Sequence, residues 1–137
     1  MLHSLKIWIT IILIASQVPT IISSDTPAEN LRTSPKNYYL NPNSTDSEPK
    51  GSFNNPFHNL DEINRVKLNP GDSILLAAGT INRGTLVLKD VKGAEDQPIV
   101  ISSYHSGNQL ADKRAIIDAK GFANGVLLED CSYIEVS

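Results

Sequence analysis

Side chains able to move protons or to hold an anion are thinly spread over the second half of the chain. The basic candidates and the acids near them are Arg83, Lys89, His105, Lys113, Arg114, Asp118, Glu129 and Asp130. Arg114 and Asp118 flank a short apolar run at even spacing, so in a strand both would lie on one face. A sugar contact is one interpretation, but a surface ion pair is favoured because no second acid-base partner is close in sequence.

The histidines and the cysteine give no stronger signal. His58 follows a Pro-Phe step and His105 lies in a Tyr-His-Ser-Gly turn, so both are predicted to be solvated rather than catalytic. Cys131 is the only cysteine, which excludes an internal disulfide and a cysteine-based zinc cluster. A small buried apolar role is predicted for it.

Oxygen ligands of the kind that Ca²⁺ prefers occur in the segment 41–48, at Asn43, Asp46 and Glu48. Their spacing does not match an EF-hand loop. Asx turns, in which Asn and Asp side chains bind the nearby backbone, account for the same residues. No metal or cofactor is therefore assigned to this chain.

Two features relate to carbohydrate. Asn43-Ser44-Thr45 is an N-glycosylation sequon, relevant only in a eukaryotic source. Tyr38, Tyr39 and Phe57 have rings able to stack on sugars, although aromatic residues at the edge of a small core are the favoured interpretation.

Length and charge exclude several classes of protein. The 137 residues suffice for one domain, and the formal net charge is -3. The twelve Lys and Arg are scattered among fifteen Asp and Glu. Nucleic-acid binding needs clustered positive charge, so no nucleic-acid partner is expected.

The N-terminus has the pattern of an export signal. A basic residue precedes the apolar run 7–15, and small polar residues follow up to Ser24, which predicts a signal peptide over residues 1–24. Cleavage near Ser16 and an uncleaved anchor are the alternatives. Residues 25–36 are polar and contain proline, which predicts a flexible leader. The mature chain is expected to be secreted, extracellular or periplasmic, without a stable membrane span.

A short amphipathic helix is predicted after residue 59. Leu60, Ile63 and Val66 recur at three-residue spacing with polar residues between them. Asn59 is a suitable N-cap, and Asn69-Pro70-Gly71 ends the helix.

From Gly71 onward the pattern is typical of short strands. Six apolar runs bounded by Gly, Pro, Asn or Asp are SILLAA, TLVLKD, PIVISSY, RAIIDA, GVLLED and YIEVS. An all-β domain follows, either a sandwich or a solenoid. Uneven connections and strands made of apolar triplets favour the solenoid, with a repeat of 20-odd residues. The short helix is then expected to cover the first end of the stack.

Several motifs in order add a family likeness. They are Tyr38-Tyr39-Leu40-Asn41-Pro42, Asp46, Asn55-Pro56-Phe57, Leu68-Asn69-Pro70-Gly71-Asp72, Gly79-Thr80, Gly84-Thr85-Leu86-Val87-Leu88 and Gln97-Pro98-Ile99-Val100-Ile101. This series, over residues 38–137, resembles the start of secreted right-handed parallel β-helix proteins of the pectate-lyase-like superfamily, such as chondroitinase B and alginate lyases. Two departures are Gly79-Thr80-Ile81, where the family has Gly-Thr-Tyr, and Gly51-Ser52, where it has Gly-Thr.

The resemblance implies that residues 37–137 are the N-terminal part of a right-handed parallel β-helix. The parent protein would be a monomeric polysaccharide lyase acting on uronate-containing polysaccharide, or a glycoside hydrolase. Its base and its arginine or Ca²⁺ would lie on later coils, so no catalytic residue is assigned here. Because the last run, residues 133–137, has no cap, a fragment that is inactive by itself is expected. A non-catalytic adhesin and an inactive truncated product are the alternatives.

Overall fold

The computed structural model describes residues 34–107 and 113–137, in which one helix and eight strands are found. In chain order they are β1 (Asn37–Leu40), α1 (Leu60–Ile63), β2 (Ser73–Ala77), β3 (Ile81–Arg83), β4 (Leu86–Lys89), β5 (Ile99–Tyr104), β6 (Ile116–Asp118), β7 (Val126–Glu129) and β8 (Ile134–Val136). The predicted signal peptide and most of the predicted leader lie outside the described residues. Within those residues, no helix is long and apolar enough to cross a membrane.

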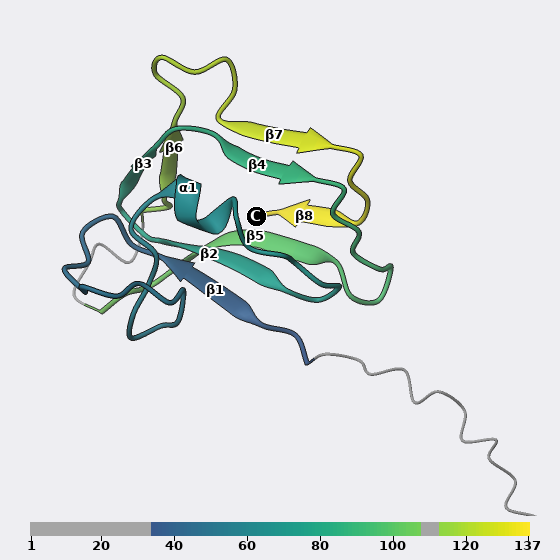
Figure 1. The fold of residues 1–137 in the computed structure, drawn as a ribbon, viewed down its shortest axis with the longest axis horizontal. Coiled ribbons are helices and arrows are strands. Elements are labelled where there is room, and N and C mark those ends of the chain that lie inside the picture. Colours follow the sequence, from purple (N-terminus) through teal and green to yellow (C-terminus); the bar gives the residue numbers. More distant parts are fainter. Residues whose placement is uncertain (1–33, 108–112) are drawn as a thin grey trace, which may run out of the picture. The chain divides into compact units, whose positions relative to one another are not determined.

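The strands form three parallel sheets, which the chain visits in turn (Figure 1). Their strand orders are β1-β2-β5-β8, β3-β6 and β4-β7. One circuit of the chain through the three sheets is called a pass. Each strand after β4 lies beside a strand of the preceding pass, and every pair of named strands is parallel. The predicted all-β class is confirmed, and the right-handed solenoid remains a prediction.

The six predicted apolar runs each contain a strand, but two details were wrong. Strand β3 was missed because its inward residue is the polar Asn82, so it lacks an apolar run. The predicted repeat of 20-odd residues agrees with the pairing of Ser73 with Val100 but is too short for the other strand pairs. Leu86 pairs with Val126 and Ile99 with Ile134, because long connections separate the strands of the second pass.

The inward side chains of the strands and of α1 make one apolar core. Its buried members are Leu40, Leu60, Ile63, Leu68, Ile74, Leu76, Leu86, Leu88, Ile99 and Ile101. Alternate residues along each strand point inward, as the burial pattern of β4 shows. Burial of these side chains is the main stabilising term, at about 25 cal/mol per Å² of apolar surface.

Helix α1 starts as predicted and ends early. The Asn59 side chain accepts a hydrogen bond from the Glu62 N–H (3.0 Å), and the Glu62 carboxylate accepts one from the His58 N–H (2.9 Å), the residue before the cap, in a variant of the capping box. Asn64 ends the helix, so Val66 lies beyond it and is only half-buried. Leu60 and Ile63 are buried against the strand core.

Asn64 has a second role at the edge of β4. Its side-chain amide donates to the Thr85 carbonyl and accepts from the Val87 N–H, both at 2.9 Å. One side chain thus satisfies two backbone groups that a neighbouring strand would otherwise bind. The helix end is therefore attached to the sheet β4-β7.

The segment 51–57 covers the outer edge of β1. The Tyr39 N–H donates to the Gly51 carbonyl, and the Tyr39 carbonyl accepts from the Phe57 N–H, both at 2.8 Å. Gly51 has φ +71°, and a Cβ there would lie 2.3 Å from the Phe57 ring. Only glycine fits this position.

Three aromatic rings hold the same loop against the sheet. Tyr39 of β1 contacts Phe53 and Tyr104 edge-on, with ring centroids 5.4 and 4.9 Å apart. Phe53 is more than half exposed and Tyr104, at the end of β5, is half-buried. Burial, and secondarily the neighbouring Tyr39, raises the pKa of Tyr104.

The buried carboxylate of Asp72 joins the start of β1 to the turn before β2. Its Oδ1 accepts from the Lys36 N–H and its Oδ2 from the Asn69 N–H, both at 2.8 Å. Lys36, the last residue of the predicted leader, is thereby held in place. Burial, and then the Asp72 charge, raises the pKa of the adjacent Tyr38.

Replacing Asp72 should strongly destabilise the domain. We expect Asp72→Ala to lower the free energy of unfolding by about 2–4 kcal/mol, because two backbone N–H groups lose a charged acceptor. Urea denaturation followed by circular dichroism measures this. The exposed Asp96→Ala is the matched control and should cost less than about 0.5 kcal/mol. Equal losses in both variants would contradict this role of Asp72.

The raised pKa values of Tyr38 and Tyr104 predict that the domain loses stability at alkaline pH. Since their folded-state pKa values lie above the ordinary 10.0, the unfolded chain releases these protons first. Their contribution to stability is complete below pH 10.0 and is lost as pH rises through the folded pKa. With Tyr38→Phe and Tyr104→Phe, the free energy of unfolding should fall less steeply above pH 10.0. Urea denaturation at a series of pH values on both sides of pH 10.0 measures this fall. An equally steep decline in the double variant Tyr38→Phe/Tyr104→Phe would refute the assignment.

Candidate functional site

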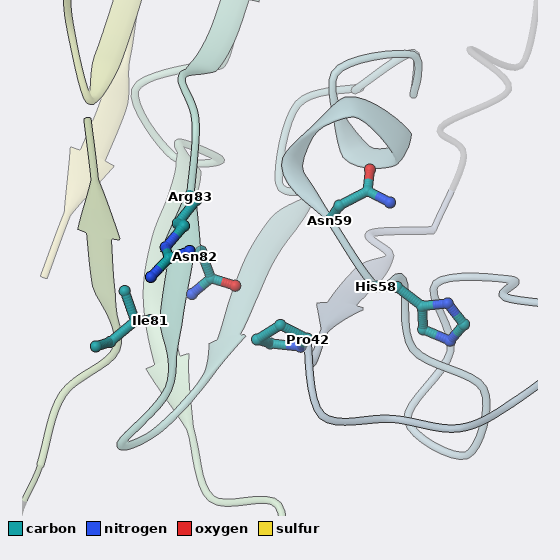
Figure 2. A pocket seen from close by; sticks show the side chains of 6 residues that line it. All are labelled: Pro42, His58, Asn59, Ile81, Asn82 and Arg83. Atoms are coloured by element: carbon teal, nitrogen blue, oxygen red, sulfur yellow. The ribbon is translucent and has the colours of Figure 1, made fainter. Parts of the chain in front are cut away.

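A pocket of about 370 Å³ lies beside β3 (Figure 2). Its lining residues come from three parts of the chain that are separate in sequence: Pro42, His58, Asn59, Ile81, Asn82 and Arg83. The parallel sheets bring the loop after β1, the start of α1 and strand β3 together here.

The pocket occurs where the covering of the strand edges is incomplete. Segment 51–57 covers the edge of β1, and Asn64 covers that of β4. In the part of the chain that the structure describes, β3 has only β6 as a strand partner. Its other side therefore faces the pocket and offers polar groups to a ligand.

Asn82 is the most unusual residue of the pocket. Its side chain is only 2% exposed, and its Nδ2 donates to the Thr80 hydroxyl (3.3 Å) and to the Ile116 carbonyl (3.4 Å). Its Oδ1 has no hydrogen-bond partner among the described residues. In Figure 2 this oxygen points from β3 toward Pro42. An unsatisfied buried acceptor is costly, so a donor from water or a ligand hydroxyl would stabilise it.

Arg83 supplies the positive charge of the pocket. Its side chain is exposed, and its Nε lies 4.0 Å from Oδ2 of Asp118. The predicted pairing of Asp118 with Arg114 is wrong for the described residues, because β3 and β6 pair in parallel and place Arg83 directly beside Asp118. At 4.0 Å and with high exposure this ion pair is weak, so the guanidinium can bind another anion.

His58 precedes α1 as predicted but is half-buried rather than fully solvated. Its Nε2 is buried without a partner in the described residues. Its ring points away from Asn82 in Figure 2, so the two side chains do not converge. His58 therefore contributes to the wall of the pocket and does not form an acid-base pair with Asn82 or Arg83.

The other charged candidates lie elsewhere. Lys89 and Glu129 are register partners on β4 and β7, 2.7 Å apart and exposed. The hydrogen bond from this ammonium to Glu129, and next the Glu129 charge, raises the pKa of Lys89. His105, Lys113, Arg114 and Asp130 are exposed and do not line the pocket.

Cys131 is half-buried rather than fully buried. Its thiol donates to the Leu88 carbonyl at 3.3 Å, and its side chain packs against the core. The predicted apolar role agrees with this packing, and the turn before β8 explains the remaining exposure.

The oxygen-rich loop does not form a metal-binding arrangement in the described residues. Oδ2 of Asp46 accepts a hydrogen bond from the Ser44 hydroxyl (2.7 Å), and the Asn41 side chain accepts one from the Asn43 N–H. Glu48 lies 3.8 Å from Lys50. The side chains of Asn41 and Asp46 thus bind their own loop, as in Asx turns.

The predicted sugar-stacking rings belong to the packing of the domain. Tyr38 and Phe57 pack against the core, and Tyr39 belongs to the aromatic cluster that holds the loop. None of them lines the pocket beside β3.

The chemistry available in this pocket is recognition. Its side chains offer a guanidinium and an amide acceptor, whereas the amide of Asn59 binds Glu62 as the cap of α1. Arginine binds carboxylates with two hydrogen bonds, and amides bind hydroxyl groups. Among the lining residues there is no carboxylate, and two converging acid-base groups, which hydrolysis or elimination needs, are not found there.

Comparison with known proteins gives a structural likeness. No family model and no curated protein matches the chain. Crystal structures of the GH136 lacto-N-biosidase from Eubacterium ramulus, as native protein and as selenomethionine derivative, match it with a TM-score of 0.56 and 28% sequence identity. The alignment covers 74% of this chain and 19% of the solved chains. The chain is thus similar to a minor part of a carbohydrate-active protein.

Proposed function

We propose that this chain is the first part of a secreted, carbohydrate-active right-handed parallel β-helix, and that the pocket beside β3 binds one sugar unit of a polysaccharide. The observation that carries the binding role is the unpartnered Asn82 amide oxygen, buried among the lining residues of a pocket to which the exposed Arg83 also belongs. A pyranose ring carries hydroxyl donors that suit the first group, and a uronate carries a carboxylate that suits the second.

Three parallel sheets visited in turn support the β-helix proposal, as does the likeness to the lacto-N-biosidase. Export rests on the predicted signal peptide, residues 1–24, which lie outside the described residues. The predicted monomeric state and the predicted Ca²⁺ in a longer parent belong to the same proposal. No residue described here is assigned to hold that ion.

The substrate class follows from Arg83. An arginine whose carboxylate neighbour is 4.0 Å away retains most of its hydrogen-bonding capacity, which favours a uronate-containing polysaccharide over a neutral one. The parent reaction is proposed to be that of a polysaccharide lyase. The solved neighbour is a glycoside hydrolase, so hydrolysis is the second candidate.

The role of this segment is proposed to be binding, with catalysis on residues outside it. The pocket offers donors and an acceptor but no acid-base pair among its lining residues. A non-catalytic glycan-binding β-helix is the alternative, and it requires the same pocket chemistry.

Removing the guanidinium should weaken uronate binding. We expect Arg83→Ala to lower the association constant for tetragalacturonate about tenfold, because one charge-assisted contact is worth about 1.5–3 kcal/mol and is partly screened at the surface. Isothermal titration calorimetry on the whole chain measures this. Arg65→Ala, another exposed arginine outside the pocket, is the matched control and should bind like the wild type.

Two results of this titration would change the proposal. Absence of binding by the folded wild-type chain would refute the sugar site. Equal affinity for tetragalacturonate and a neutral tetrasaccharide, unaffected by Arg83→Ala, would replace the uronate by a neutral sugar and would favour the hydrolase class.

A further inference from the structure

The segment 41–44, directly after β1, forms a turn that its first residue holds closed. The Ser44 N–H donates to the Asn41 carbonyl and the Asn43 N–H donates to the Asn41 side-chain oxygen, both at 3.0 Å. Asparagine at the first position and proline at the second are the residues that favour such a turn. Asn43 therefore lies at the tip of the turn, where it is exposed.

The fold makes no use of the Asn43 side chain. Among the described residues, no hydrogen bond joins its amide group to another residue, and only its backbone N–H is bonded. By contrast, the amide group of Asn59 caps α1 and that of Asn64 binds the edge of β4. A chemical change at the Asn43 amide would therefore cost the domain none of its described contacts.

Asn43 is also the only asparagine of the chain that begins the pattern Asn-X-Ser/Thr, in Asn43-Ser44-Thr45. This pattern is an N-glycosylation acceptor when it lies in a surface loop of an exported protein. The Thr45 residue that completes the pattern is exposed, and the Ser44 hydroxyl between them binds Asp46 at 2.7 Å. The described turn thus provides the surface position that the pattern requires.

We propose that Asn43 is an N-glycosylation acceptor and that its glycan stands beside the pocket next to β3. In the reaction, the amide nitrogen of Asn43 forms a bond to C1 of the first sugar of a lipid-pyrophosphate-linked oligosaccharide. The bond from C1 to the pyrophosphate oxygen breaks, the lipid pyrophosphate leaves with the electron pair, and the amide nitrogen loses one proton. The oligosaccharyltransferase of a eukaryotic secretory pathway supplies this donor.

Pro42 determines the position of the glycan relative to the pocket. It lines the pocket and directly precedes Asn43, and consecutive Cα atoms lie about 3.8 Å apart (Figure 2). The Asn82 oxygen points toward this side of the pocket. A bulky glycan here reduces the directions from which a polysaccharide can enter. This effect on binding rests on the proposed function, whereas the modification itself does not.

Mass spectrometry of the secreted protein tests the modification. Residues 25–137 are secreted from cultured mammalian cells behind a signal peptide that these cells cleave, so the result does not depend on the predicted signal peptide. We expect peptide-N-glycosidase F to lower the mass of the secreted chain by that of an oligosaccharide and to leave aspartate in place of Asn43. A secreted chain in which Asn43 is unmodified would overturn the proposal.

Matched variants identify the acceptor. Asn43→Gln and Thr45→Ala should both abolish the mass change, and the second variant leaves the acceptor amide in place. Thr45→Ser should retain the glycan because it keeps the hydroxyl group. Asn54→Gln, at an exposed asparagine of the same loop outside the pattern, should also retain it. An oligosaccharide that persists in Asn43→Gln would assign the sugar to another side chain and would overturn the proposal.

Isothermal titration calorimetry with tetragalacturonate tests the position of the glycan. We expect the association constant of the glycosylated chain to be at least about threefold below that of Asn43→Gln, because fewer directions of approach remain open. The variant is preferred to enzymatic removal, which leaves a carboxylate that would itself repel a uronate. Equal constants would overturn the placement beside the pocket. Absence of binding by both proteins would refute the sugar site, whereas the mass change would still support the modification.

Discussion

The carboxylate of Asp72 is the contact on which the arrangement of the first strands depends. It is buried and binds the backbone N–H groups of Lys36 and Asn69, while its own carbonyl accepts from the Val100 N–H at 3.1 Å. One residue thus connects the starts of β1, β2 and β5. A buried charge is tolerated only when it is well bonded, so these contacts define the alignment of the sheet's first strands.

The two ends of the domain differ in how far their strand edges and apolar side chains are covered. At the first end, α1, Asn64 and segment 51–57 satisfy strand edges and bury Leu60 and Ile63. The gap left beside β3 is the pocket with Asn82 and Arg83. At the other end, the edges of β6, β7 and β8 and their apolar residues stay uncovered among the described residues. The proposed sugar binding therefore belongs to the end of the domain where α1 and segment 51–57 lie.

Much of the fold was predictable because each apolar run has the composition of a strand and is bounded by turn residues. Asn59 was recognised as the helix cap because capping is a local interaction. The pocket was not predicted. Its key residue, Asn82, interrupts the apolar pattern, and the weak pairing of Arg83 with Asp118 depends on a register between β3 and β6 that spans a long connection. Arg114, which is closer to Asp118 in sequence, is the partner that the local pattern predicts.

The sequence by itself determined which segments become strands, where the short helix begins and that the domain is all-β, because these depend on side-chain pattern and on local capping and turns. Only the tertiary structure decided which strands are neighbours, and therefore which polar groups meet and which apolar residues stay exposed. Val126 and Leu86 are equally apolar in the sequence, and only the stacking of the passes buries one and exposes the other. The physical reason is that burial and charge pairing depend on distance in space, whereas a sequence pattern reports only on neighbours along the chain.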